Sequence, residues 1–299
     1  MSTPIDQPAA PNVQPAAPAS GMLHDQGYRH YGGQRAPHGQ AWMVIARMHL
    51  MNSLKYRPFL MLLLVAWARV IYYGVRIYVA SVSSQVPAFF AVNPGLWQEF
   101  LTGQGTFVFL VTIAQAGIIA DDRRANALQL YLSKPLTRLE YIIGKLVPPM
   151  LWLLGVTWLP AMLLLILQVV LSGSIAFLRE NFFLLPAITL ASLVDTLLST
   201  FLILALSSLS KSRRFVSVMF AGIMFFTFGM YQSLRAITGS RLWAAIAPGQ
   251  MVDVITAWVF RARTEPLVPV PLAVAVVVGL IVLSIVILER RVRGVEVVA

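Results

Sequence analysis

The chain has 299 residues, of which 58% are hydrophobic and only 12% are charged, and its formal net charge is +11. A soluble domain of this size would carry about 25% charged residues, so the composition excludes an ordinary water-soluble protein and indicates a chain that lies in a bilayer. The sequence contains no cysteine, which excludes disulfide bonds, thiolate nucleophiles and cysteine metal sites.

The first 40 residues are expected to form a disordered cytoplasmic tail. Five prolines alternate with Ala, Gln and Ser up to residue 18, and Gly, His and Tyr dominate from there to Gly39. Such a segment cannot bury enough apolar surface to offset the entropy lost on ordering. The membrane domain is therefore expected to comprise residues 41–299.

Residues 41–55 have the pattern of an amphipathic helix. Ala41, Val44, Met48 and Met51 recur at 3-4-3 spacing, with polar residues elsewhere on the helical wheel. A helix of this kind can lie in the headgroup plane as an elbow before the first span. The alternative is an N-terminal extension of that span, but Pro58 favours a break.

Six stretches are long and apolar enough to cross a membrane, which takes about 20 residues in a helix. Only helices satisfy their own backbone groups at this length, so we predict an all-α polytopic membrane protein with six transmembrane helices. The predicted spans are residues 58–80, 103–120, 146–171, 183–209, 215–234 and 268–288.

The distribution of basic residues predicts the orientation. With both termini cytoplasmic, the flanks and loops on the cytoplasmic side hold 14 Lys and Arg residues and the outer loops hold 5. Cytoplasmic loops carry such an excess, so this orientation is expected, in a plasma (cytoplasmic or inner) membrane.

The outer-face segment at 236–267 contains one ambiguous stretch, residues 242–260. It is apolar enough to be considered as a seventh span, but Pro248, Gly249, Gln250 and Asp253 lie near its middle. We predict an outer-face helix or re-entrant element, anchored at the interface by Trp243 and Trp258.

The longest cytoplasmic loop, residues 117–146 between spans two and three, has helix signals of its own. Asp121 and Asp122 can cap a helix start, and Pro135 would end that helix. Thr137 and Glu140 then form the T-x-x-E pattern of a capping box for the next helix. The sequence therefore predicts a short helix at about 121–133, held between two spans and able to transmit a push from a cytoplasmic partner.

This loop resembles the one in type 2 ABC exporter permeases, the six-span membrane subunits of ATP-binding-cassette transporters. Their loop runs from acidic and basic residues through alternating leucines to Ser, a basic residue and Pro, and closes on apolar-apolar-Gly-Lys. Here the corresponding stretch is DDRRANALQLYLSKPLTRLEYIIGKL. The elbow WMVIARMHLMNSLKYRPFL, the span count and the basic C-terminus extend the resemblance over residues 41–294.

The resemblance implies that the 121–133 helix is a coupling helix that docks on a separate ATP-hydrolysing subunit. The alternative is that its apolar residues lie against the bilayer. The implied contact residues are Asp121, Asp122, Arg123, Arg124, Leu128, Leu130, Tyr131, Leu132, Ser133, Lys134 and Pro135.

A phosphate loop of the form G-x-x-x-x-G-K-[ST] is missing from the sequence. At the only Gly-Lys pair, Gly144-Lys145, Leu139 occupies the first glycine position and Leu146 follows. We therefore expect no enzyme activity and no cofactor in this chain, with ATP and Mg bound by the partner subunit. The resemblance also implies a second copy or a sister permease, and leaves room for an outer-face accessory protein.

Three ionisable residues lie within the predicted spans, namely Arg69, Arg76 and Asp195. Charges at this depth are costly and should face protein or water. We expect Arg76 to snorkel to the outer face, and Asp195 is a candidate ion-pair partner for Arg69. A polar stripe on the fourth span accompanies Asp195 and faces either a helix interface or a translocation path; its members are Thr189, Ser192, Thr196 and Ser199.

Two other classes of function compete with the exporter. An ion- or proton-coupled carrier would have more intramembrane acids and inverted repeats, and a membrane-embedded enzyme would have clustered His, Asp or Glu near one interface. The basic charge is explained by topology and by anionic lipid headgroups, so no nucleic acid partner is expected.

Overall fold

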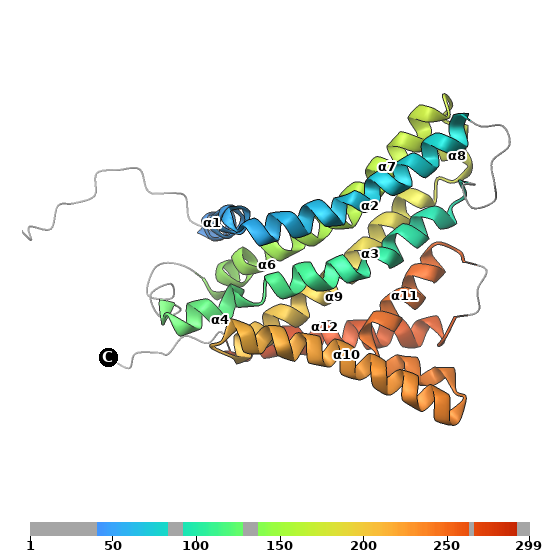
Figure 1. Ribbon diagram of the computed structural model, residues 1–299. Helices are drawn as coiled ribbons and strands as arrows, with labels where there is room; N and C mark the ends of the chain where they lie inside the picture. Colours follow the sequence, from blue (N-terminus) through green and yellow to red (C-terminus); the bar gives the residue numbers. More distant parts are fainter. Residues whose placement is uncertain (1–40, 83–91, 128–136, 263–265, 292–299) are drawn as a thin grey trace, which may run out of the picture. The chain divides into compact units, whose positions relative to one another are not determined.

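In a computed structural model of the chain, residues 41–82, 92–127, 137–262 and 266–291 are described, and every regular element among them is a helix. Figure 1 shows long helices running side by side between two ends of a bundle. The predicted all-α class is therefore confirmed.

Among the described residues, six helical segments are long and apolar enough to cross a membrane, as the sequence predicts. Two of them are each divided into two helices, and a short helix, α8 (Ala176–Glu180), follows the third segment. The six are α2 (Arg57–Val82), α3 (Gly95–Ala114) with α4 (Gly117–Arg124), α6 (Arg138–Val156) with α7 (Trp158–Leu171), α9 (Leu184–Leu209), α10 (Arg213–Thr238) and α12 (Val270–Arg291).

The third segment breaks at Thr157, and Pro160 explains why. Proline has no N–H, so Pro160 cannot donate the helical bond to the carbonyl of Val156. The fully buried Gln104 of α3 replaces it, because its Nε2 donates to the Val156 oxygen at 2.8 Å. A side chain from a neighbouring span thus satisfies the backbone that the proline leaves open.

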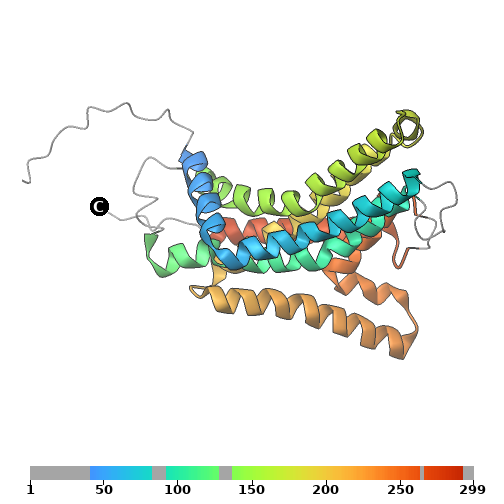
Figure 2. The same ribbon diagram turned by 45° about the horizontal axis from the view of Figure 1, so that its top comes forward.

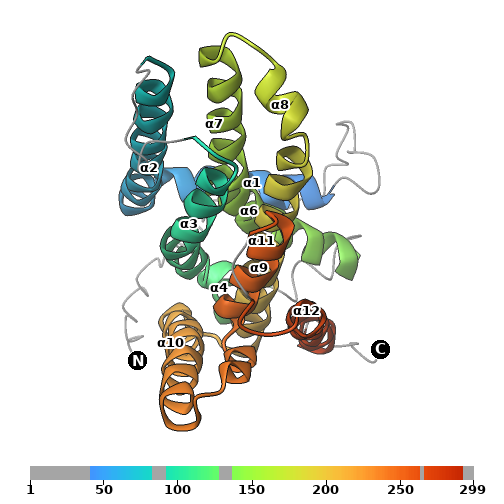
Figure 3. The same ribbon diagram turned by 90° about the vertical axis from the view of Figure 1, so that its right-hand side faces the viewer.

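The centre of the bundle is formed by α3–α4 and α9. In the most apolar window of each of these segments 56% of the residues are buried, against 17% for α2, α10 and α12. Figure 3, which looks along the bundle, shows α9 in the middle with α7, α10 and α12 around it. Several polar side chains of α3 and α9 are accordingly buried among other helices, including Gln104, Thr112 and Ser192.

Basic residues gather at one end of the bundle, which we call the basic end. It holds the break between α1 and α2, the end of α4, the starts of α6 and α10, and the end of α12 (Figure 1). Its described basic residues are Arg47, Lys55, Arg57, Arg123, Arg124, Arg138, Lys145, Lys211, Arg213, Arg214, Arg290 and Arg291.

The predicted elbow segment is a separate helix, α1 (Ala41–Lys55), which ends one residue before α2 begins. Figure 2 shows α1 turned across the direction of α2. Ile45 and Ala46 are buried against the bundle, while Val44, Met48 and Met51 of the predicted apolar stripe are half to two-thirds exposed. The contact with α6 is close, because a Cβ on Gly144 would lie 3.0 Å from Ile45.

The ambiguous stretch at residues 242–260 does not form a seventh span. It forms a 3-10 helix, η2 (Arg241–Ile246), and α11 (Pro248–Val259), whose 12 residues are too few to cross a bilayer. α11 packs against α9 and α12, with Met251 and Ile255 buried. Trp243 and Trp258 are both exposed, and their role as interfacial anchors stays a prediction.

Candidate functional site

The predicted coupling segment is only partly described. Asp121 to Arg124 belong to α4, which ends at Arg124, and Asn126 follows with a left-handed φ of 52°. A single helix over 121–133 is therefore interrupted at this turn. Asp121 and Asp122 also do not cap a helix start, since they lie in the second half of α4. The remaining predicted contact residues, Leu128, Leu130, Tyr131, Leu132, Ser133, Lys134 and Pro135, lie outside the described residues.

The far side of the loop is formed as predicted. Thr137 is the N-cap of α6 and accepts a hydrogen bond from the Glu140 backbone N–H at 3.2 Å. The Glu140 carboxylate accepts one in return from the Thr137 N–H at 2.9 Å. This reciprocal capping box fixes where the loop ends and the third span begins.

Within α4 the two acidic residues point in different directions. Asp121 is exposed, whereas Asp122 accepts a bond from the Tyr141 hydroxyl at 2.8 Å and pairs with Lys145 at 2.7 Å. The Lys145 side chain is 5% exposed and that of Asp122 is 16% exposed. Asp122 therefore ties the last turn of the second span to the first turns of the third.

A serine from α9 fixes the bend between α3 and α4. Ala116, the N-cap of α4, has no side chain that can cap the first N–H groups of the helix. Ser207 caps them from outside, accepting from the N–H of Ile119 at 3.0 Å and of Ala120 at 2.9 Å. It also donates to the Ala116 carbonyl at 2.7 Å.

Two arginines complete these attachments. Arg123 donates to the carbonyl oxygen of Ser208 on α9, and Arg213 of α10 donates to the Ala114 carbonyl at the end of α3 at 2.7 Å. A cation suits the negative end of a helix. We call the set Asp122, Arg123, Tyr141, Lys145, Ser207 and Arg213 the joint, because it connects the second span, α3–α4, to three other spans.

The elbow helix reaches the joint through His49. Its Nε2 lies 3.0 Å from the Gln115 side-chain oxygen, at the bend between α3 and α4. Burial lowers the pKa of His49 from its usual value, with smaller opposing effects from Gln115 and Asp122 and smaller lowering effects from Lys145 and Arg213. The neutral imidazole therefore links α1 to the base of the loop.

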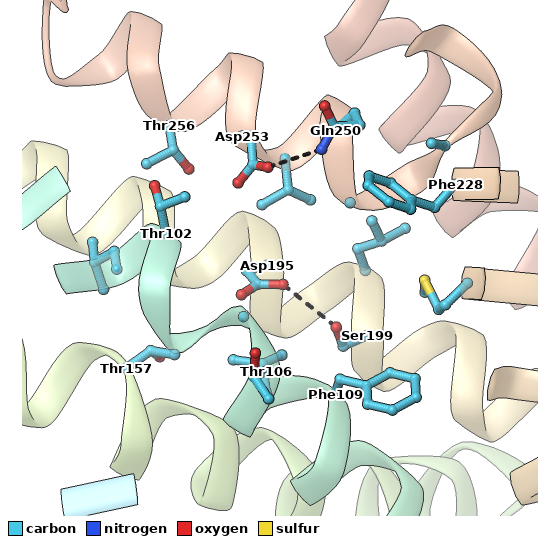
Figure 4. A pocket seen from close by; sticks show the side chains of 18 of the residues that line it. Thr102, Thr106, Phe109, Thr157, Asp195, Ser199, Phe228, Gln250, Asp253 and Thr256 are labelled. Carbon is cyan, nitrogen blue, oxygen red and sulfur yellow. Dashed lines mark hydrogen bonds between the residues drawn. The ribbon is translucent and has the colours of Figure 1, made fainter. Parts of the chain in front are cut away.

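A second candidate site is a cavity of about 650 Å³ between α3, α9, α10 and α11. Asp195 of α9 and Asp253 of α11 both line it, and Figure 4 shows their carboxylates facing the same space from opposite sides. Asp195 accepts a long bond from Ser199 at 3.5 Å, and Asp253 accepts one from Gln250 at 3.3 Å. Both carboxylates therefore retain acceptor capacity.

The polar stripe on α9 is divided between the cavity and helix packing. Ser192, Asp195 and Ser199 line the cavity. Thr189 instead accepts a bond from the indole N–H of Trp158 on α7 at 3.2 Å, and Thr196 is fully buried without a partner for its hydroxyl. The stripe therefore serves helix packing at Thr189 and Thr196 and lines a cavity at its other members; the translocation path stays a prediction.

The predictions for Arg69 and Arg76 are both wrong. Arg69 donates to the Tyr73 hydroxyl at 3.5 Å, while Asp195 bonds Ser199, so the Arg69–Asp195 pair does not form. Arg76 does not snorkel: its side chain is 7% exposed and pairs with Glu99 at 3.0 Å. The second span starts at Gly95, earlier than predicted, which brings Glu99 opposite α2.

Sequence reasoning missed Asp253 as a site residue and treated it only as an argument against a seventh span. A signal was present, because Gln250, Asp253 and Thr256 recur every three residues and all line the cavity. Burial raises the pKa of Asp253 to about 6. Within the described ranges no group of three or more His, Asp and Glu side chains is placed to hold a metal ion.

Comparison of the chain with protein-family models and with curated proteins found no match.

Proposed function

We propose that this chain is the membrane-spanning permease subunit of an ATP-driven exporter, with hydrolysis carried out by a separate ATP-binding-cassette subunit. Docking of that subunit on residues 121–135 would tilt the second and third spans and open a path outward. In a second version of this proposal, the same six-span domain transmits force to an outer-face partner and exports no substrate. Both versions place the basic end in the cytoplasm and pair the chain with a second copy or a sister permease.

The joint is the observation that carries this proposal. Asp122, Tyr141 and Lys145 connect α4 to α6 on the two sides of the loop, and Ser207 connects α4 to α9. A load applied to the loop would therefore reach three spans through short polar bonds. A loop that only connects two helices needs no such attachment.

The elbow supports the same proposal. α1 packs one face on α6 and leaves an apolar face exposed, with Val44 at 66% and Met51 at 49%. Apolar side chains with neighbouring Arg47 and Lys55 suit the headgroup region of a bilayer. A helix anchored there would give the joint a fixed support against which α4 can move.

The test is a pull-down of the solubilised protein from its native membrane, with mass spectrometry of the proteins that co-purify. We expect an ATP-binding-cassette subunit, lost in a Leu130→Asp/Tyr131→Asp variant. The control is Ile237→Asp, which adds an acid at an 80% exposed position at the other end of α10 and should keep the partner. Recovery of the chain without any ATPase would contradict the proposal.

One observation favours a second candidate, an ion- or proton-coupled carrier. Asp195 and Asp253 line one cavity inside the bundle. The sequence alone places only one acid, Asp195, within a predicted span. Carriers use such acids to bind the coupling ion. Liposomes that hold only this chain would distinguish the two, because transport driven by an ion gradient without ATPase supports the carrier and its absence supports the exporter.

A further inference from the structure

The cavity between α3, α9, α10 and α11 has a charge that the protein does not balance. Two carboxylates line it, and no Lys, Arg or His is among the described residues that do so. The buried Arg76 of α2 does not line the cavity and is paired with Glu99 instead. Two like charges in a space of low dielectric raise each other's cost, and a cation between them would relieve it.

A second, independent observation comes from Ser192. This serine lines the cavity, is 1% exposed, and its hydroxyl has no hydrogen-bond partner. A buried polar group in a native protein is normally bonded, and leaving one unbonded costs about 1–3 kcal/mol. An occupant of the cavity with a polar group can supply the missing partner.

The side of the cavity formed by α10 and part of α3 is aromatic. Phe109 lies with its ring centroid 5.8 Å from that of Phe220 and 5.3 Å from that of Phe225. In Figure 4, Phe109 and Phe228 lie to one side of the two carboxylates, and Thr102 and Thr256 lie to the other. Aromatic faces attract organic cations, so this wall suits an apolar body that carries a positive charge.

From these features we propose that the cavity binds an amphipathic organic cation. Its charged group lies between Asp195 and Asp253, a polar substituent reaches Ser192, and its apolar part packs on the wall of Phe109, Phe220, Phe225 and Phe228. The volume of about 650 Å³ lies within the roughly 300–1,000 Å³ of small-molecule sites. A bare metal ion would need more acidic ligands and would leave the aromatic wall unused.

This inference names a substrate class for the exporter and in that respect rests on the proposed function. The binding test, however, uses the purified full-length chain in nanodiscs and needs no ATPase. Failure to bind the cation leaves the docking experiment unaffected. Failure to recover an ATPase partner leaves the cation site unaffected.

The experiment compares tetraphenylphosphonium with tetraphenylborate, two ions of nearly the same size and shape and of opposite charge. We expect the wild-type protein to bind the cation and to reject the anion. Asp195→Asn and Asp253→Asn should each weaken cation binding at least about tenfold, and the double variant more. Glu180→Gln neutralises an exposed carboxylate on α8, outside the cavity, and should bind as the wild type does.

A filling variant separates the cavity from the rest of the surface. Gly105 lines the cavity, and a Cβ built on it meets no atom within 4 Å. Gly105→Trp should therefore block tetraphenylphosphonium without a backbone clash, whereas Gly279→Trp, at an equally open position on α12, should not. Unfolding temperatures of both variants close to that of the wild type would show that loss of binding is not loss of folding.

Three results would overturn the proposal. Equal binding of both ions, with no effect of the Asp→Asn variants, would show an apolar pocket that lipid fills. Calcium binding that is lost in the Asp→Asn variants, together with no binding of tetraphenylphosphonium, would show an inorganic cation site. Tetraphenylphosphonium binding that Gly105→Trp leaves unchanged would place the ion elsewhere.

Discussion

The joint and the cavity are both polar sites inside an apolar helix bundle, and they differ in how their polar atoms are satisfied. In the joint, Asp122 has two partners and the Ser207 hydroxyl makes three bonds. In the cavity, Ser192 has no bond and each carboxylate accepts a single long one. A satisfied network gives rigidity, and an unsatisfied one leaves free energy for an occupant.

The comparison implies opposite responses to the same kind of substitution. Replacing a polar group of the joint by an apolar one should remove bonds that hold spans together. Replacing an unpartnered polar group near the cavity should remove a desolvation cost. Stability measurements on matched variants therefore test whether the two sites differ in this way.

The largest effect is expected at Asp122 and Lys145. Lys145→Met leaves the Asp122 carboxylate buried without its cation, and breaking a buried pair in this way costs about 3–5 kcal/mol. Thermal unfolding in detergent should show a large fall in the unfolding temperature. The double variant Asp122→Asn/Lys145→Met should regain part of the loss, because no isolated charge remains. A double variant as unstable as the sum of the two single variants would show that the pair is not coupled.

A smaller loss is expected at Ser207. Ser207→Ala leaves the N–H groups of Ile119 and Ala120 and the Ala116 carbonyl without partners, at a cost of about 1–3 kcal/mol. Ser208→Ala is the matched control, because that buried hydroxyl donates only to Ala205 within its own helix. Equal unfolding temperatures for the two variants would remove Ser207 from the joint.

The role of His49 predicts how the joint responds to pH. The pKa of His49 is lower in the folded protein than in the unfolded chain. As the pH falls, the folded state therefore binds fewer protons than the unfolded state does. The stability that it contributes is present above about pH 6.5 and is lost as the pH decreases below that value. The wild type should therefore lose more stability than His49→Gln between about pH 7.5 and about pH 5. Parallel stability profiles for the two proteins would contradict this.

Features that depend on local sequence were predictable. The six spans follow from hydropathy and length, and the Thr137–Glu140 box follows from residue types three positions apart. The short length of α11 was predictable too, because Pro248 and the polar residues after it interrupt the apolar run. Each of these properties is encoded within about 25 residues, so no knowledge of the packing was needed.

Features that depend on which helices meet could not be predicted. Asp122 looks like a helix cap or a docking residue until α6 brings Lys145 and Tyr141 beside it. Depth alone suggests Arg69 as the partner of Asp195, but Asp253 of α11 shares its cavity. The partner of such a polar side chain comes from a helix distant in the sequence, so it is a property of the packing.

The smallest effect, and the one with opposite sign, is expected at Thr196. This residue is fully buried beside the cavity-lining stripe, and its hydroxyl has no partner. Valine has nearly the same shape without the hydroxyl, so Thr196→Val removes an unpaid desolvation cost and leaves packing intact. The unfolding temperature should stay the same or rise slightly. The corresponding gain in the free energy of unfolding should not exceed about 1 kcal/mol. Thr112→Val on α3 is the control, because the Thr112 hydroxyl is equally buried but donates to the Val108 carbonyl at 2.7 Å, and its loss should destabilise slightly. If Thr196→Val destabilised the protein more than Thr112→Val, the hydroxyl of Thr196 would have a partner, and the contrast between a satisfied joint and an unsatisfied cavity region would not extend to it.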